Sequence, residues 1–224
     1  MEESVSPWLL FGMACIVMIA LALFAISSTR RLEKIPTTRR QNLVELIVEG
    51  LNNFTVDIIG PEGREYTPFI GSLFIFILCA NLLGLFPGLK SPTSSLSITV
   101  SLALIVFVAY NVIGIRKAGV KRYLKHLIGE PVWLAPLMFP IHVIGELARP
   151  LSLSVRLFGN MFGEEMVLAI LASLTLVIVP YLIAIPTQFP IMLFDVFISF
   201  VQAMVFSMLS AIYISLALEA AEEH

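Results

Sequence analysis

Residues 91–115 have the sequence SPTSSLSITVSLALIVFVAYNVIGI, which contains no charged side chain although Lys90 and Arg116 flank it directly. A helix needs about 20 apolar residues to cross the roughly 30 Å hydrocarbon layer of a membrane, and this run is longer than that. Lipid offers the backbone no hydrogen-bond partners, so only helices and closed barrels span a membrane, and barrel strands alternate between polar and apolar residues. This run does not alternate, so it predicts a membrane-spanning helix.

Further uncharged runs lie on both sides of this segment, at residues 4–29, 66–89, 166–194 and 196–218. Hydrophobic residues make up 58% of the chain, charged residues 13%, and the mean hydropathy is +0.94. A soluble domain is about 45–50% apolar and about 25% charged. The composition therefore excludes a soluble enzyme, a disordered chain and a nucleic-acid binder, and it predicts an all-α polytopic membrane protein.

We expect a single membrane domain over residues 1–224, with about five membrane crossings. Its predicted parts are a first span at 4–29, a surface amphipathic helix at 42–59, a helical hairpin at 66–115, and two long, tilted helices at 131–218. In the surface helix, apolar residues such as Leu43, Leu46 and Leu51 recur at helical spacing, while Glu45 and Glu49 take another face.

Positive charges give the expected orientation, because Lys and Arg stay on the cytoplasmic side of a membrane. The first run is preceded by Glu2 and Glu3 and followed by Arg30, so it does not have the pattern of a cleaved signal peptide. We expect the N-terminus outside, and both residues 30–64 and the basic stretch after Arg116 inside. Five crossings then leave the C-terminus in the cytoplasm.

Sequence features that would indicate a bound cofactor are missing. Cys15 and Cys79 both lie in apolar runs, where they are expected to be small buried hydrophobic residues and neither a disulfide nor a metal site. No GxxxxGK[ST] pattern occurs, so the chain has no nucleotide-binding loop. We expect no cofactor and no metal.

Several titratable or charged residues interrupt the apolar C-terminal part of the chain: His142, Glu146, Arg149, Arg156, Glu164, Glu165 and Asp195. A charge at the centre of a bilayer costs about 2.5–3.5 kcal/mol on insertion scales, so such residues normally serve a polar pathway or a partner. The alternatives are snorkelling and a structural ion pair. Glu146 and Arg149 lie three residues apart on the expected helix, where a structural pair and a functional role are both open.

Helical geometry sorts these residues into faces. At about 100° per residue, one narrow stripe holds Arg149, Ser152, Arg156, Asn160 and Gly163, with Gly159 close to it. Small residues allow another helix to approach closely in lipid, so the stripe predicts a docking surface that carries a permanent cation. On the last helix, one face holds Asp195, Ser199, Gln202, Phe206 and Tyr213. Glu164, Glu165 and Asp195 supply the carboxylates that a proton relay needs.

The stretch ELARPLSLSVRLFGNMFGEE at residues 146–165 closely resembles the signature of the subunit a family of F-type ATP synthases. Three further stretches agree with it: GPEGR at 60–64, NLLGLFPG at 81–88 and QAMVF at 202–206. The resemblance runs from the amphipathic segment to the C-terminus. It implies a non-catalytic stator subunit of the membrane sector, which forms two proton half-channels and couples proton flow to ring rotation and ATP synthesis.

The resemblance also implies partners and site residues. The partners are the ring of c subunits, subunit b of the peripheral stalk, the remainder of the ATP synthase and the lipid bilayer of a bacterial plasma (inner) membrane. Arg156 aligns with the family's essential cation, which faces a carboxylate of the c-ring. The implied proton path contains Asn160, Glu164, Glu165, Asp195, Gln202, Glu146 and His142, and the implied ring-facing small residues are Ser152, Gly159 and Gly163.

Two departures from the family pattern leave parts of the path open. Asp195 stands where some relatives carry a histidine, and His142 stands where some carry a glutamate, so the relay order and the inner half-channel are not fixed. The choice between protons and sodium depends on the ring subunit and also stays open. Two other classes of protein are the alternatives. A secondary transporter usually has two related halves, and no counterpart of the Arg156 motif occurs in the first half of the chain. A structural scaffold would not explain the stripe.

Overall fold

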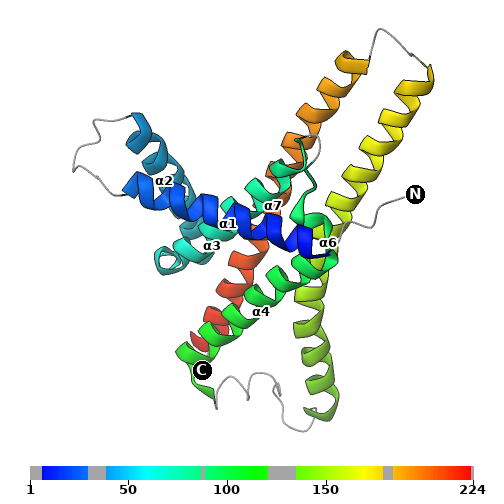
Figure 1. The fold of residues 1–224 in the computed structure, drawn as a ribbon. Helices are drawn as coiled ribbons and strands as arrows, with labels where there is room; N and C mark the ends of the chain where they lie inside the picture. The colour runs from blue at the N-terminus through cyan, green and yellow to red at the C-terminus, as the bar shows by residue number, and fades with distance from the viewer. Residues whose placement is uncertain (1–6, 30–38, 87–88, 121–134, 179–183, 223–224) are drawn as a thin grey trace.

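The computed structural model describes residues 7–29, 39–86, 89–120, 135–178 and 184–222, and this part of the chain is all-α (Figure 1). The helices in chain order are α1 (Pro7–Thr29), α2 (Arg39–Ile59), α3 (Gly63–Leu83), α4 (Leu96–Ala118), α6 (Ala135–Ile178) and α7 (Ala184–Glu222). A short 3-10 helix, η1 (Pro92–Ser94), precedes α4.

Four of these helices are long and apolar enough to cross a membrane: Trp8–Thr29, Gly63–Leu83, Leu96–Ala118 and Met192–Ala220. The prediction of an all-α polytopic membrane protein is therefore confirmed. Among the residues whose side chains the structure describes, no stretch of α6 meets this criterion of length and composition, and the fifth crossing stays a prediction.

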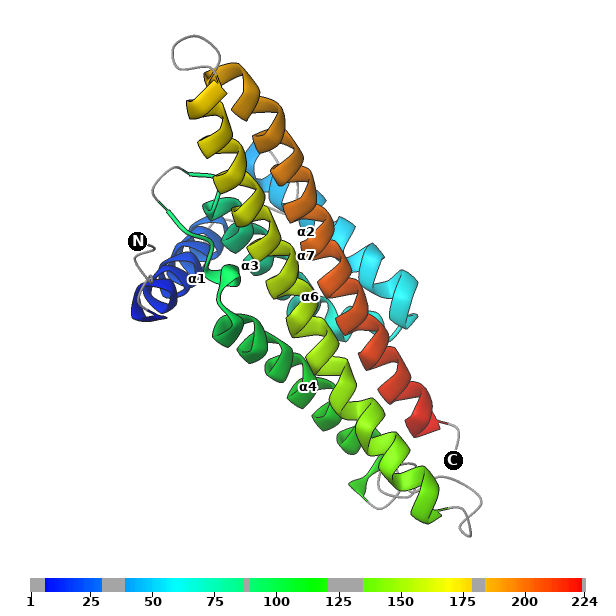
Figure 2. The ribbon, with the colours of Figure 1, turned by 90° about the vertical axis from the view of Figure 1, so that its right-hand side faces the viewer.

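The two long C-terminal helices dominate the structure. α6 has 44 residues and α7 has 39, and Figure 2 shows them running alongside each other in opposite directions. Pro140 and Pro150 lie inside α6 without ending it. The prediction that the last two helices are long is confirmed.

α2 and α3 form a tight pair joined by a short turn. Gly60 in this turn has φ = +93°, a backbone conformation that favours glycine. A Cβ atom on Gly63 would lie 2.8 Å from the backbone oxygen of Thr55, so only glycine permits this approach of the two helices. The Thr67 hydroxyl donates a hydrogen bond to Asn52 Oδ1 at 3.3 Å across the same contact.

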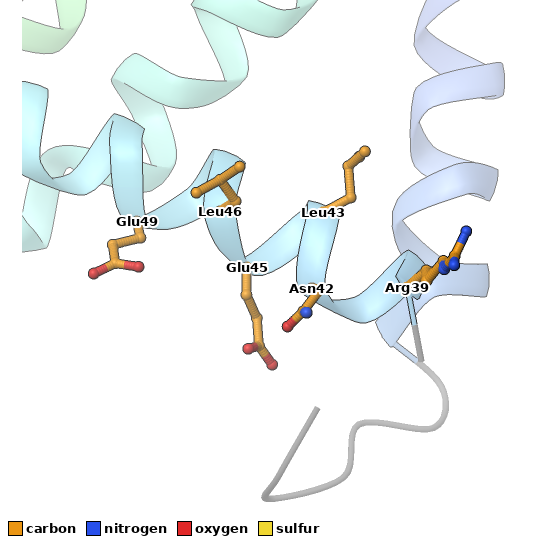
Figure 3. Close-up of a pocket in the computed structure, with 6 residues that line it drawn as sticks. All are labelled: Arg39, Asn42, Leu43, Glu45, Leu46 and Glu49. Atoms are coloured by element: carbon orange, nitrogen blue, oxygen red, sulfur yellow. The ribbon is translucent and has the colours of Figure 1, made fainter. Parts of the chain in front are cut away.

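The two halves of α2 have different surroundings. The N-terminal half exposes Leu43 and Leu46, and Figure 3 shows a shallow groove there, lined by Arg39, Asn42, Leu43, Glu45, Leu46 and Glu49. The C-terminal half contacts α3 and α7 and buries Thr55. A helix is thus present at 42–59 as expected, its place on the membrane surface stays a prediction, and its groove contains no residue of the predicted proton path.

A single apolar core connects α3, α4, α6 and α7. Its fully buried members include Ile70, Ile77, Val106, Tyr110, Leu153, Leu157, Phe206 and Ile214. α6 contributes Leu153 and Leu157, and Met161 is also buried on the same helix. Since these residues recur every four positions, they fix which face of α6 turns toward the core and which face turns away.

Candidate functional site

Arg156 lies on the face of α6 that turns away from the core. Its neighbours Leu153 and Leu157 are 2% and 0% exposed, whereas Arg156 itself is exposed. Within the part of the chain that the structure describes, Arg156 has no hydrogen bond, ion pair or ring contact. The permanent positive charge of Arg156 therefore points out of the chain and lacks a counter-ion there.

Small residues surround Arg156 on this open face. Ser152 and Gly159 are exposed and Gly163 is half-buried. A Cβ atom added to Gly159 or Gly163 would meet nothing within 4 Å. The described residues therefore leave this surface uncovered, and the cation stands among side chains that offer no steric barrier to another helix.

Arg149 differs from the rest of the predicted stripe. Its Nη1 lies 2.7 Å from Glu146 Oε1, and its guanidinium lies over the rings of Tyr110 and Tyr213 at 5.8 and 5.4 Å. The backbone position belongs to the stripe, but the long side chain reaches round the helix to α4 and α7. The expectation that Arg149 shares the open surface of Arg156 is corrected in this respect.

Asn160 and Gln202 connect α6 with α7 one helical turn beyond Arg156. Asn160 Nδ2 donates a hydrogen bond to Gln202 Oε1 at 2.5 Å. Gln202 is 3% exposed and its Nε2 is buried without a partner among the described residues. The structure thus brings together two predicted path residues that are far apart in the sequence.

Three carboxylates lie further along the same helix pair. Glu164 and Glu165 are on α6, Asp195 is on α7 and only 3% exposed, and Glu164 is within electrostatic range of the other two. Among the described residues, one buried oxygen of each carboxylate has no hydrogen-bond partner, and neither has the buried hydroxyl of Ser199. Buried polar atoms without partners are costly unless water or a proton satisfies them. This arrangement therefore suits a hydrated path that exchanges protons.

The remaining predicted residues, His142 and Glu146, lie on α6 on the N-terminal side of Arg156. His142 is exposed. Glu146 accepts a hydrogen bond from the Tyr110 hydroxyl at 2.7 Å, in addition to its ion pair with Arg149. Tyr110 was not singled out from the sequence, although it is the one tyrosine in the uncharged run at 91–115.

Comparison with known proteins adds a family to this geometry. Residues 10–215 match the family described as ATP synthase A chain. The chain is 44% identical to ATP synthase subunit a 1 of Pelobacter propionicus, over 92% of this chain and 86% of that protein. It is 45% identical to ATP synthase subunit a of Trichlorobacter lovleyi, over 92% and 85%. For ATP synthase subunit a of Geobacter sulfurreducens the identity is 43%, over 92% and 86%.

Proposed function

The chain belongs to the ATP synthase subunit a family, and on that premise we propose that it is the static half of a rotary proton motor, with Arg156 facing a carboxylate of the c-ring. The observation that carries this proposal is the exposed Arg156, which has no partner among the described residues and stands beside glycines with open space in front of them. A cation in this position requires an anionic partner from another chain.

Physical chemistry gives Arg156 two roles in such a motor. A ring carboxylate crosses lipid at low cost only when it is protonated and neutral, and beside a fixed cation it is stabilised as an anion. Arginine stays protonated at physiological pH, so it carries no protons itself. A ring carboxylate must therefore release its proton before it passes Arg156 and take up another afterwards. Each proton that crosses releases about 2.3 kcal/mol per 100 mV, and rotation sums these contributions.

The proposed proton path has an outer and an inner part. Glu164, Glu165 and Asp195, with Asn160 and Gln202, form the outer half-channel. The support for this assignment is the set of buried, unpartnered polar atoms that lines α6 and α7 in this region. His142 lies on the opposite side of Arg156 along α6, toward the basic cytoplasmic end of α4, and marks the inner half-channel, and Glu146 lies about one helical turn from it.

Purification of the chain from its native membrane in mild detergent tests the proposed function. A motor subunit should copurify with a small hairpin protein that forms a ring, and with a peripheral-stalk subunit. Subunit identities and the mass of the assembly are measurable by mass spectrometry. A chain that purifies alone and binds a small solute would instead be a secondary transporter, and the motor proposal would be wrong.

We expect Gly163→Leu to impair ATP-driven proton pumping by about tenfold, because overpacking a close helix contact costs about 1–3 kcal/mol. The charge near Arg156 is unchanged, so the effect is steric. Gly163→Ala should be milder, and Gly12→Leu on α1, where a Cβ atom also meets nothing within 4 Å, is the matched control. Pumping is measured in inverted vesicles at equal complex content. Normal pumping with leucine at position 163 would show that no helix docks there.

A further inference from the structure

A cluster of polar and aromatic side chains joins three helices on the inner side of Arg156. It consists of Tyr110 on α4, Glu146 and Arg149 on α6, and Tyr213 on α7, and we refer to these four residues as the clamp. Tyr110 is 1% exposed, while the side chains of Arg149 and Glu146 are 31% and 22% exposed. The clamp is therefore largely enclosed by the protein.

Both charges of the clamp are compensated within the chain. Glu146 accepts from the Tyr110 hydroxyl at 2.7 Å through one oxygen and pairs with Arg149 at 2.7 Å through the other. The Arg149 guanidinium also lies over the two tyrosine rings, whose centroids are 5.9 Å apart. Such ring contacts stabilise a cation that is removed from water. Both oxygens of Glu146 therefore have partners, whereas one oxygen each of Glu164, Glu165 and Asp195 has none among the described residues.

The clamp supplies directional contacts on the inner side of Arg156, and the Asn160–Gln202 hydrogen bond supplies one on the other side, whereas the buried α6 residues between them are largely apolar. On α6, Leu153, Leu157 and Met161 are buried, and hydrophobic contacts alone have no preferred direction. A shift of α6 by one residue would move Arg156 by about 1.5 Å along the helix and turn it by about 100°. Hydrogen bonds and ion pairs of defined geometry oppose both movements.

We propose that the clamp is a positioning device that fixes the depth and rotation of Arg156, and that Glu146 acts in it as the counter-ion of Arg149 and not as a proton carrier. Arg149 precedes Arg156 by two helical turns, roughly 10 Å, so the position of one determines that of the other. The role of the clamp rests on the proposed function of Arg156. The clamp residues are positioning residues, since in this proposal they act through Arg156 and do not contact the c-ring.

Removal of one or both charges distinguishes a counter-ion from a carrier. Glu146→Gln leaves Arg149 without its counter-ion, and Arg149→Met leaves Glu146 without its counter-ion. Removing one partner of an enclosed ion pair is strongly unfavourable, so each single variant should reduce ATP-driven pumping by about tenfold. In the double variant neither charge remains, and pumping should return to within about twofold of the unmodified complex. A proton carrier cannot be restored by removing Arg149. Glu219→Gln, on an exposed carboxylate of α7, is the matched control.

The position of α6 can be measured separately through Ser91 and Met161. Ser91 Oγ lies 3.9 Å from Met161 Sδ, so the yield of the disulfide that an oxidant forms between cysteines at these two positions reports how closely the two segments approach in the intact complex. The measurement requires Cys15→Ala and Cys79→Ala to remove the native thiols. Each single clamp variant should lower the disulfide yield at least twofold, and the double variant should restore it.

Three outcomes decide the matter. Lower pumping and lower disulfide yield in the single variants, both restored in the double variant, support the clamp. If Glu146→Gln lowers pumping but leaves the disulfide yield unchanged, and the double variant does not restore pumping, Glu146 is a proton carrier and the proposal is overturned. Normal pumping in both single variants would also overturn the proposal. Arg156→Ala is tested in parallel. If this variant pumps normally, the proposed function is wrong. If it is impaired but the clamp variants pump normally, only the clamp proposal is wrong.

Discussion

Replacement of Arg156 by lysine is expected to abolish gradient-driven ATP synthesis while the complex still assembles. Lysine keeps a positive charge but loses the planar guanidinium, and an ammonium group in a dehydrated site can give up its proton, which a guanidinium does not. The fixed cation would thus become a group that exchanges protons. We expect synthesis to fall by at least about a hundredfold, the scale of losing one well-placed electrostatic group at a reacting charge.

Arg156→Ala should show a second effect, because it removes the barrier between the half-channels as well as the partner of the ring carboxylate. Passive proton conductance through the membrane sector should rise, in addition to the loss of synthesis. Both quantities are measured in vesicles of matched protein content. Arg116→Ala, at the exposed C-terminal end of α4, controls for the loss of an arginine elsewhere. Near-normal synthesis in both Arg156 variants would contradict the mechanism.

Asp195→Asn is expected to slow proton uptake by about a hundredfold, the lower range of what a positioned proton-transfer group contributes. Asparagine has nearly the same shape but cannot hold and release a proton at that position. Asp195 is 3% exposed and one of its oxygens has no partner among the described residues, as is expected of a group that exchanges protons with water or a neighbouring carboxylate. Glu165→Gln should act in the same direction, and proton uptake is followed during ATP-driven pumping in inverted vesicles.

Glu49→Gln, on the exposed surface of α2, provides a carboxylate control that lies outside the proposed path. Assembly must be compared in all three variants, since a slow rate counts only at equal complex content. Pumping at unmodified rates in both Asp195→Asn and Glu165→Gln would reject the outer half-channel. Loss in only one of them would identify the indispensable member of the relay.

The helices could be predicted from the sequence because membrane spans are decided locally, by length and the absence of charge. Charge-free runs such as 91–115 and the length of the segment after residue 131 were enough to expect the hairpin and the two long helices. The face that carries Arg156 was also predictable, because helical periodicity alone places it with Gly159 and Gly163. No such rule gives the partners of a long side chain.

The contacts between helices depended on packing that no local pattern contains. Arg149 shares the stripe of Arg156 by periodicity, yet its side chain extends to Tyr110 and Tyr213, which are distant in the sequence. The close approach of Gly63 to Thr55 also depends on how two helices fold back on each other. In both cases the deciding quantity is the geometry of a neighbouring helix and not the residue type.

The uncovered cation on α6 has a consequence for the thermodynamics of the chain as a separate molecule. With no counter-ion among the described residues, the chain alone holds Arg156 at a cost of about 2.5–3.5 kcal/mol if it lies near the bilayer centre. A partner that compensates this charge in the folded chain, and does not bind the unfolded chain, stabilises the fold by mass action. The stability of this protein is consequently not a property of its own sequence alone, but a function of the concentration and affinity of its neighbour.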